Sequence, residues 1–545
     1  MKNILFHLFI VSWRFPRNAI NRAENGVKFQ RRKLLFIGVI IFCLLFWVEI
    51  VEIAAKSQHI SKDYKDYNII MVWIDALRAD HLSCYGYDRK TSPNINKLAH
   101  ESIVFKNNFT PHTVTIASFM SIITSLYPAS HGVLYVAKDR LSPRIKTLAQ
   151  ILQMYDYTTA WFGPEGCPHL DPKIGYGRGF DTVGNFPENL KKGRIILFDS
   201  IENNKNEKFF LNFHTYKVHD PYMPSSKYKD KFTKKKMKEV KETREELLKA
   251  TFDMIKDGLL QKKGVVWEEL GEELASELIS KDLFKGDFNA RKMQEIFTFL
   301  MDKKQFHKWD NMVCEAYKSR IDCDDINIIK HLKDLYDATI LEFDTEIIGP
   351  LITNLKELNL YDKTMIIICA DHGDEFCEHG GLSHGATLYD EVIHVPLIIK
   401  FPWIKKGRRI QQLTQTVDIM PTILDLLGIP IPYHAQGKSL VPLIKKKNAS
   451  PLRKYVFGQL PYLSTIRSKE WKFSVNKNGT KELFHLQSDP GEQRNIYFRK
   501  RHIASKLESE LKKWEASLPS YKEKSSFLPH IDKATQERIK KTGYW

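Results

Sequence analysis

Two distant stretches of the chain each end in acidic residues that could bind a metal ion. Residues 69–74 are apolar and lead into Asp75, and residues 365–370 are apolar or small and lead into Asp371 and His372. Uninterrupted apolar runs of this length are typical of strands buried on both faces. Carboxylates and neutral imidazoles are common ligands of divalent cations. The pattern predicts one cation shared by Asp75, Asp371 and His372.

Each of these residues also has a simpler interpretation. An aspartate that follows a strand often accepts backbone hydrogen bonds within a loop, and a lone histidine is often a surface residue. The metal hypothesis therefore requires the two strands to end side by side. Open α/β sheets meet this requirement, because they bind ligands at the carboxyl ends of their strands.

A hydroxyl group is expected near the same edge of the sheet. Residues 116–126 have helical periodicity and Pro128 ends it, so Thr115 stands at the N-cap position. Capping alone would explain a threonine there. The functional interpretation is a nucleophile at the positive end of the helix dipole. Thr115 would share the cation of Asp75, Asp371 and His372, be ionised by it and attack an anionic ester. Thr113 is the alternative nucleophile if the register differs.

The composition fits a large folded enzyme. The chain has 545 residues, of which 43% are hydrophobic and 27% charged, and we expect two globular units. Its net charge of +18 would suit a nucleic acid or a membrane surface. We expect no nucleic-acid partner, because the basic residues crowd positions 1–33 and are otherwise scattered, without any nucleic-acid-binding motif.

The amino-terminal region predicts a membrane anchor. Residues 34–48 are apolar, Gly or Cys, and the run continues to Ala55 with only Glu49 and Glu52 as interruptions. A bilayer requires ~20 such residues. The positive-inside rule then predicts a cytoplasmic segment at 1–33, a single transmembrane helix at 34–55 and an extracytoplasmic remainder. A cleaved signal peptide is the alternative.

Several other segments have recognisable patterns. Residues 91–98 open a helix with Ile95, Leu98 and Ile103 on its apolar face, and residues 335–344 predict a helix beside the strand that ends at Asp371. The chain has 7 cysteines, too few for a disulfide scaffold at this length, although Cys314 and Cys323 are close enough in sequence to pair.

The chain divides into a large and a small region. Helical spacing at 229–256 and 267–283 predicts a helical insertion at 225–332, which we expect to cover the cleft. A membrane-facing or partner-binding role is the alternative. Short strands at 455–458 and 471–475, with turns between them, predict a small subdomain at 431–518. Residues 519–545 are predicted to form a polar tail.

A set of motifs in order resembles the sulfatase family, within the alkaline phosphatase superfamily. They are DALRADHLSCYGY (75–87), TSPNINKLA (91–99), SIITSLYPASHGV (121–133), HDPYMP (219–224), DHGDEFCEHG (371–380), VPLIIKFP (395–402), VDIMPTILDLLGIP (417–430) and ELFHLQSDPGEQRN (482–495). The resemblance implies an α/β fold with a large mixed, mostly parallel sheet flanked by helices. It also implies a catalytic domain at 66–430 and a small carboxy-terminal α+β subdomain.

The resemblance also assigns roles to single residues. It implies that Asp75, Asp371 and His372 are metal ligands and that Thr115 is the nucleophile. His219 matches a histidine that contacts the transferred group, and His384 falls near a substrate-contacting lysine of the family.

The chain departs from the family at the nucleophile. Sulfatases of the formylglycine type carry Cys or Ser, then Pro and Arg at fixed offsets, where this chain has Thr115, Ala117 and Phe119. Threonine cannot become the aldehyde of those enzymes. Ala76 stands where many sulfatases have another aspartate ligand. Threonine nucleophiles in the superfamily belong to enzymes resembling phosphodiesterases, nucleotide pyrophosphatases and lipid-linked phosphoethanolamine or phosphoglycerol transferases.

We therefore expect a membrane-anchored hydrolase or transferase that depends on a divalent cation (Ca, Mg, Mn or Zn) and acts on phosphate or sulfate esters, with phosphate esters favoured. Its substrate is an anionic ester, lipid- or glycan-linked. Thr115 would attack in line, and water or an alcohol would resolve the threonine ester. His219 and His384 would stabilise charge or protonate the leaving oxygen. Alternatively, they would form a second metal site with His214.

Two rival functions are a sulfatase that works without the aldehyde and a non-catalytic binding protein on the same scaffold. Retention of Asp75, Asp371 and His372 argues against the binding protein.

Overall fold

The computed structural model describes residues 67–134, 139–164, 177–187, 189–220, 222–233, 244–262, 272–281, 295–296, 299 and 321–521. The predicted cytoplasmic segment (1–33), the predicted transmembrane helix (34–55), Cys314 and the tail from 522 lie outside the described residues. None of the helices within these described ranges has the length and apolar character needed to cross a bilayer.

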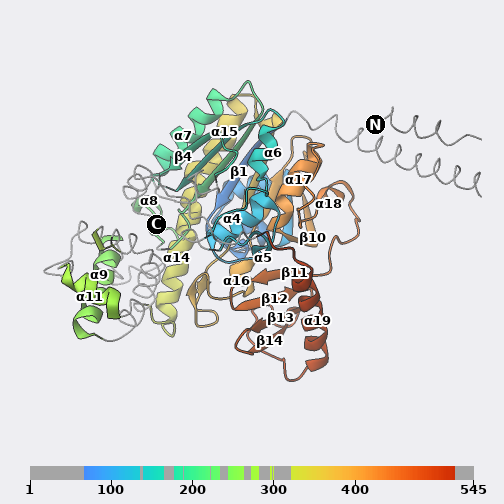
Figure 1. The fold of residues 1–545 in the computed structure, drawn as a ribbon. Helices are drawn as coiled ribbons and strands as arrows, with labels where there is room; N and C mark the ends of the chain where they lie inside the picture. Colours follow the sequence, from blue (N-terminus) through green and yellow to red (C-terminus); the bar gives the residue numbers. More distant parts are fainter. Residues whose placement is uncertain are drawn as a thin grey trace, which may run out of the picture. The chain divides into compact units, whose positions relative to one another are not determined.

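The main body is built on an 8-stranded sheet with the order β10-β2-β9-β6-β1-β5-β3-β4 (Figure 1). Among these strands, only β9 (Leu397–Lys400) runs antiparallel to its neighbours. The other strands are β1 (Asn68–Ile74), β2 (Ser102–Phe109), β3 (Thr158–Pro164), β4 (Thr182–Phe186), β5 (Phe209–Thr215), β6 (Thr364–Cys369) and β10 (Arg408–Gln415). The expected large, mostly parallel sheet is confirmed.

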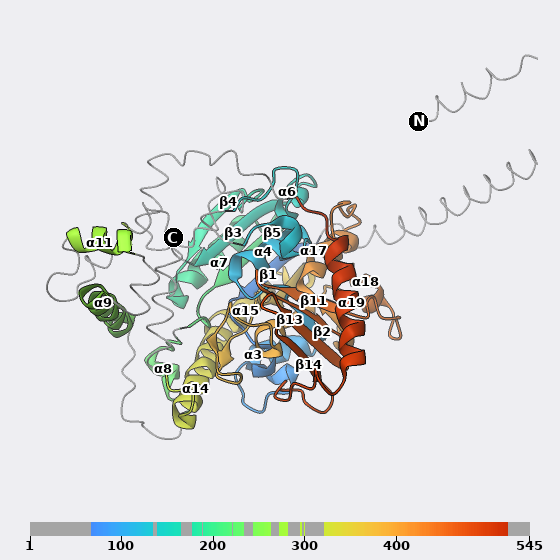
Figure 2. The same ribbon diagram turned by 60° about the horizontal axis from the view of Figure 1, so that its bottom comes forward.

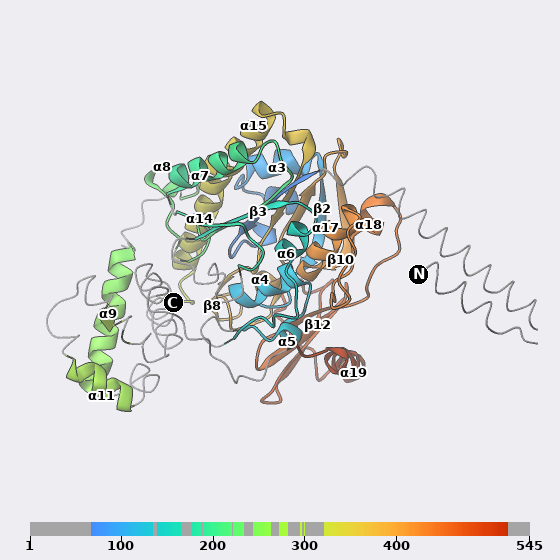
Figure 3. The same ribbon diagram turned by 45° about the horizontal axis from the view of Figure 1, so that its top comes forward.

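Helices cover both faces of this sheet (Figure 3). One face packs against α4 (Thr115–Thr124), α6 (Leu148–Gln153), α17 (Ile419–Leu426) and α18 (Val441–Lys445). The other face packs against α3 (Pro93–Ala99), α7 (Leu190–Asn203), α14 (Ile326–Phe343) and α15 (Gly349–Glu357). Because side chains alternate along a strand, Met71 of β1 points to the first set and Val72 to the second. This two-sided burial explains the continuous apolar runs in β1 and β6.

Two helix boundaries differ from the predictions. Helix α4 begins at Thr115, with Val114 as an extended N-cap residue, so Thr115 is the first helical residue and does not cap the helix. Ile103 belongs to β2 rather than to α3, because the chain turns after Ala99. Helix α14 contains the predicted segment except for its last residue, Asp344, which begins a π-helical turn at Asp344–Ile348.

A second, smaller sheet lies in the carboxy-terminal region (Figure 2). Its strands β11 (Val456–Gln459), β12 (Leu463–Arg467), β13 (Trp471–Asn476) and β14 (Lys481–His485) are antiparallel. Helix α19 (Arg501–Ser517) packs on one face through Ala504, Leu507 and Leu511. The expected small α+β subdomain is therefore present.

The predicted insertion contains helices in its described parts. These are α8 (Ser226–Lys229), α9 (Arg244–Gln261) and α11 (Glu272–Ser280). They overlap the two segments whose helical spacing was noted in the sequence. The proposed role of this insertion as a cover remains a prediction.

The disulfide joins Cys323 to Cys377, with Cα atoms 5.5 Å apart. The suggested pairing of Cys323 with Cys314 is therefore wrong. Cys377 lies between the short strands β7 (Glu375–Phe376) and β8 (Leu382–Ser383), and Cys323 precedes α14. The two are brought together because Tyr336 of α14 packs against Phe376, with ring centroids 5.1 Å apart. Sequence distance gave no indication of this contact.

Removing this disulfide should reduce stability. It closes a loop with a sequence separation of 54 residues, and in the chain-entropy model a loop of that size stabilises the fold by roughly 4 kcal/mol. Replacing both cysteines with serine should lower the midpoint of chemical unfolding, and a reductant should lower that of the wild type but not of the variant. Equal midpoints for the wild type and the variant without reductant would contradict this prediction.

Candidate active site

The central strands of the sheet bring the predicted residues to one edge. Strand β1 pairs in parallel with both β5 and β6, and their carboxyl ends carry Asp75, His214 and Asp371. Strand β2 leads through residues 110–114 into α4, which begins at Thr115. Four segments far apart in sequence therefore meet at the edge where open α/β sheets bind ligands.

The three predicted metal ligands form one buried group. Asp75, Asp371 and His372 each have 0% exposure, and one ligand atom of each lies within 4.8 Å of the others. The Nε2 atom of His372 is 3.3 Å from Asp371 Oδ2 and 3.7 Å from Asp75 Oδ1. The structure brings these residues together as expected.

The chemistry of this group fits a divalent cation. Asp75 Oδ1 and Asp371 Oδ2 are buried and accept no hydrogen bond from any residue within the described ranges. Burial and then the negative charge of Asp371 raise the pKa of Asp75 well above its usual value. Burial lowers the pKa of His372 to about 4, so its imidazole is neutral and able to act as a ligand. A cation would offset the two adjacent carboxylates and use their free oxygen atoms.

The hydroxyl group of Thr115 lies beside this group. Its Oγ1 atom is 3.4 Å from Asp75 Oδ2 and 3.3 Å from His372 Nε2. The hydroxyl of Thr113 instead donates to the carbonyl of Thr387 at 3.3 Å. Of the two candidate nucleophiles, the geometry favours Thr115.

His214 contacts Asp75, whereas the sequence suggested it as part of a second metal site with His219 and His384. Its Nε2 atom lies 2.8 Å from Asp75 Oδ2, and its ring stacks on Trp73 with centroids 4.3 Å apart. It therefore orients Asp75, which strand periodicity alone did not indicate. The suggested group of His214, His219 and His384 is not among the candidate metal groups of the described chain.

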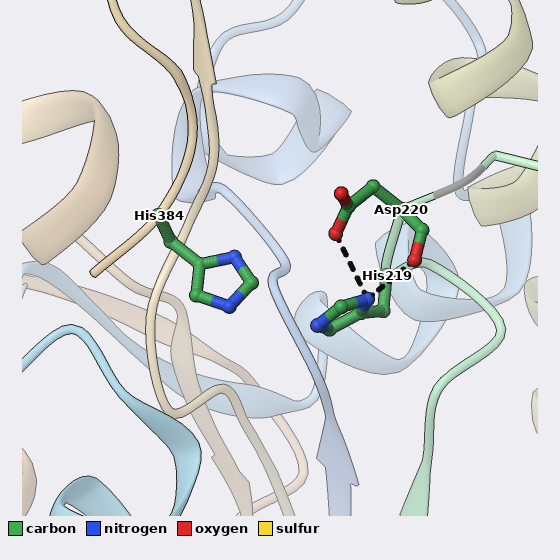
Figure 4. Close-up of side chains that lie close together, drawn as sticks. All are labelled: His219, Asp220 and His384. Atoms are coloured by element: carbon green, nitrogen blue, oxygen red, sulfur yellow. Dashed lines mark hydrogen bonds and ion pairs between the residues drawn. The ribbon is translucent and has the colours of Figure 1, made fainter. Parts of the chain in front are cut away.

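His219 and His384 instead form a group with Asp220 (Figure 4). The Nδ1 atom of His219 lies 2.9 Å from Asp220 Oδ1 and 2.6 Å from the Asp220 carbonyl oxygen. Burial opposes protonation of His219, but the charge and hydrogen bond of Asp220, together with the charges of Asp75 and Asp374, outweigh burial and raise the pKa of His219 well above its usual value. A raised pKa favours the imidazolium form of His219, which is suited to contact an anion or to protonate a leaving oxygen.

His384 connects the two groups. Its ring stacks on that of His372, with centroids 4.0 Å apart, and its Nδ1 atom lies 2.7 Å from Asp374 Oδ1. The other Asp374 oxygen accepts a hydrogen bond from the Tyr222 hydroxyl at 2.8 Å. Asp374 and Tyr222 therefore fix the orientation of His384. Sequence reasoning missed both, although Asp374 lies within the motif that supplied His372.

The backbone of Ala76 takes part where many sulfatases have another aspartate. Ala76 adopts a left-handed conformation with φ of 55°, and its N–H group donates to Asp371 Oδ1 at 3.3 Å. A left-handed conformation is costly for a residue with a Cβ atom, and such strain often occurs at functional sites. The main chain at this position thus orients one ligand without adding another carboxylate.

Comparisons with known proteins identify the family of the chain. A family model described as Sulfatase matches residues 67–429. A second, described as N-sulphoglucosamine sulphohydrolase, C-terminal, matches residues 378–517.

Two characterised relatives differ in how much of the chain they match. An N-acetylglucosamine-6-O-sulfatase of Bacteroides thetaiotaomicron is 24% identical over 526 residues, covering 88% of this chain and 91% of the relative. Arylsulfatase K of Homo sapiens is 33% identical over 198 residues, covering 34% of this chain and 37% of the relative.

Solved structures share the fold. A structure of a protein in complex with its substrate, D-glucosamine-2-N,6-O-disulfate, has a TM-score of 0.59 at 22% identity and covers 84% of this chain and 100% of its own. A phosphonate monoester hydrolase of Agrobacterium radiobacter has a TM-score of 0.57 at 18% identity, covering 82% of this chain and 95% of its own.

Proposed function

Because this chain belongs to the sulfatase family and is an ester-hydrolysing enzyme, we propose that it hydrolyses the sulfate ester of a sugar with Thr115 as an unmodified nucleophile. One observation carries the assignment of the nucleophile. Thr115 is the first residue of α4, and its Oγ1 atom lies within 3.4 Å of both Asp75 Oδ2 and His372 Nε2. The positive end of the helix dipole favours an anion at this position.

The residues of this site divide the chemistry between them. A divalent cation held by Asp75, Asp371 and His372 would lower the pKa of the Thr115 hydroxyl and offset the negative charge of the substrate ester. Thr115 Oγ1 loses its proton to solvent and attacks the sulfur atom in line, and the bond between sulfur and the sugar oxygen breaks. Water then attacks the sulfur of the threonine sulfate ester, which releases sulfate and restores the Thr115 hydroxyl. His219 binds Asp220 through Nδ1, so its Nε2–H is available to protonate the leaving alcohol oxygen. His384, held by Asp374, hydrogen-bonds the transferred group.

The proposed substrate follows from the comparisons. One relative that matches most of the chain is named as an N-acetylglucosamine-6-O-sulfatase, and a protein of similar fold binds a sulfated glucosamine. Both support a sulfated amino sugar as the substrate class.

Phosphate-ester hydrolysis is the second candidate, and Thr115 itself favours it. Sulfate bound to threonine cannot be released through an aldehyde, because threonine cannot form one. A phosphothreonine intermediate can instead be resolved by water. The fold is also shared with a phosphonate monoester hydrolase.

A substrate comparison tests the proposal. The purified protein should be assayed with 4-nitrophenyl sulfate, glucosamine 6-sulfate, and a phosphate monoester and diester, each with Mg²⁺, Ca²⁺, Mn²⁺ or Zn²⁺. The primary proposal requires sulfate release as the fastest metal-dependent reaction. Faster phosphate release would replace it with the second candidate, and no turnover of any ester would refute both.

The protonated state of His219 gives a pH prediction. Its raised pKa means that the imidazolium is present below that pKa and is lost as the pH rises through it. The wild-type kcat/KM should therefore fall on the alkaline side, and H219Q should lack that limb. The rate of H219Q at neutral pH should be lower by about 10²-fold or more for an alkyl leaving group. For 4-nitrophenol, which needs little protonation, the loss should be smaller; an equal loss for both leaving groups would exclude this role.

We also propose that residues 34–55 anchor the enzyme in the membrane, with its catalytic domain outside the cytoplasm. The apolar sequence of this segment and the basic residues before it support the proposal. The Cys323–Cys377 disulfide supports it further, since disulfides persist in oxidising compartments. Protease digestion of intact cells should degrade the catalytic domain, and a fully protected domain would contradict this orientation.

A further inference from the structure

The short helix α16 (Asp390–Ile393) joins three loops that carry the site residues. The N–H of Gly373, next to His372, donates to the carbonyl of Val392 at 2.8 Å. The N–H of Thr110, which precedes α4, donates to Ile393 at 2.9 Å, and that of Ala79 donates to His394 at 3.3 Å. The backbone of α16 and of its C-cap residue His394 therefore contacts all three loops.

The contact with the metal-ligand loop is close. A Cβ atom added to Gly373 would lie 2.2 Å from the carbonyl oxygen of Glu391. Real Cβ contacts are essentially never this short, so glycine is needed for α16 to lie against this loop. Any displacement of α16 would thus be transmitted to the backbone that follows His372.

Charged residues of the small carboxy-terminal sheet hold α16 in place. Arg467 of β12 donates to both carboxylate oxygens of Asp390, at 2.8 and 3.1 Å. Lys472 of β13 contacts Asp390 Oδ1 at 3.0 Å and Glu492 at 2.8 Å. Glu492 in turn accepts a hydrogen bond from the Asp390 N–H at 2.6 Å.

These contacts are buried. The side chains of Lys472 and Glu492 have 0% exposure, and those of Arg467 and Asp390 have 10% and 17%. Buried and mutually hydrogen-bonded charges hold a fixed geometry more strictly than exposed pairs, because each loses hydration that only its partner replaces. Lys481 of β14, by contrast, pairs with Glu508 at a more exposed position of the same sheet.

From this connection we propose that Lys472, Arg467 and Glu492 are positioning residues that set the geometry of the metal ligands through Asp390 and α16. The carboxy-terminal subdomain then influences catalysis indirectly, because none of these side chains touches the site. The inference rests on the proposed function only in assuming that Asp75, Asp371 and His372 bind a cation.

Two variants of the full chain test this proposal. K472M removes the buried positive charge of the lysine side chain. D390N keeps the shape of the aspartate side chain while weakening its ion pairs. Each should raise the Kd for Mn²⁺ by about 10-fold or more, the range seen when partners of metal ligands are lost. Each should also lower kcat for 4-nitrophenyl sulfate more than it changes KM. K481M is the matched control and should leave the Kd, kcat and KM unchanged.

The outcomes separate the possible failures. Wild-type protein that binds no Mn²⁺ would refute the metal assignment of the proposed function. Normal Mn²⁺ binding by folded K472M and D390N, with only a lower unfolding temperature, would overturn the positioning role.

Amide hydrogen exchange tests the same connection in the wild-type protein, independently of variant folding. Because coupling between sites is reciprocal, Mn²⁺ should slow exchange in residues 390–394 and 467–472. Unchanged exchange in both segments would also overturn the inference.

Discussion

Replacing Thr115 with alanine should lower kcat by at least about 1000-fold, as expected when a nucleophile is removed. The metal content and the unfolding temperature should stay at wild-type values. The hydroxyl contributes no helix cap, since Val114 is the N-cap residue of α4, and alanine has the highest helix propensity. Its two polar contacts are long, at 3.3 and 3.4 Å, so their loss should affect the fold little.

Two further variants sharpen this test. Thr115→Ser retains the hydroxyl and should keep part of the activity. Thr113→Ala removes the alternative nucleophile, whose hydroxyl donates to the Thr387 carbonyl, and should change kcat much less than Thr115→Ala does. A Thr113→Ala variant that is inactive beside an active Thr115→Ala would reverse the assignment.

Replacing Asp371 with asparagine should produce the second large effect. The substitution removes one negative charge from a buried group in which Asp371 Oδ2 has no hydrogen-bond donor within the described residues. We expect metal affinity to fall by at least about 100-fold, at or beyond the upper end of the loss caused by removing partners of metal ligands. Activity should fall with it, because the counter-charge for the anionic ester is lost.

Metal analysis after dialysis, with activity measured over a range of added cation, will check this result. Asp344→Asn is a suitable control, since Asp344 is another buried aspartate but accepts hydrogen bonds from the N–H groups of Asn94 and Ile95. It should retain its metal. If Asp371→Asn kept both the metal and the wild-type rate, the ligand assignment would be wrong.

The buried strands and the site residues next to them could be predicted from local sequence patterns, whereas the fold was implied by the resemblance of the ordered motifs to the sulfatase family. Asp75 and Asp371 could be found because each follows a strand buried on both faces, and parallel strands place such residues at one edge. Thr115 could be found because helical periodicity begins directly after it. These signals lie within short segments, so one sequence was enough to detect them.

The missed features depend on contacts between distant segments. His214 bonds Asp75 because β5 and β1 are neighbours, and Tyr222 reaches Asp374 across 152 positions. The same holds for Cys323, whose partner lies beyond α14. Periodicity describes which face of an element is buried but not which distant side chain meets it, so these partners required the three-dimensional structure.

The central claim is that the unmodified hydroxyl of Thr115 attacks the ester. Mass spectrometry of enzyme quenched with acid during turnover tests it most directly. The account predicts that the peptide containing residue 115 carries an intact threonine in the resting enzyme and a sulfo or phospho group on that residue during turnover. An unmodified peptide throughout turnover, together with full activity of Thr115→Ala, would contradict it.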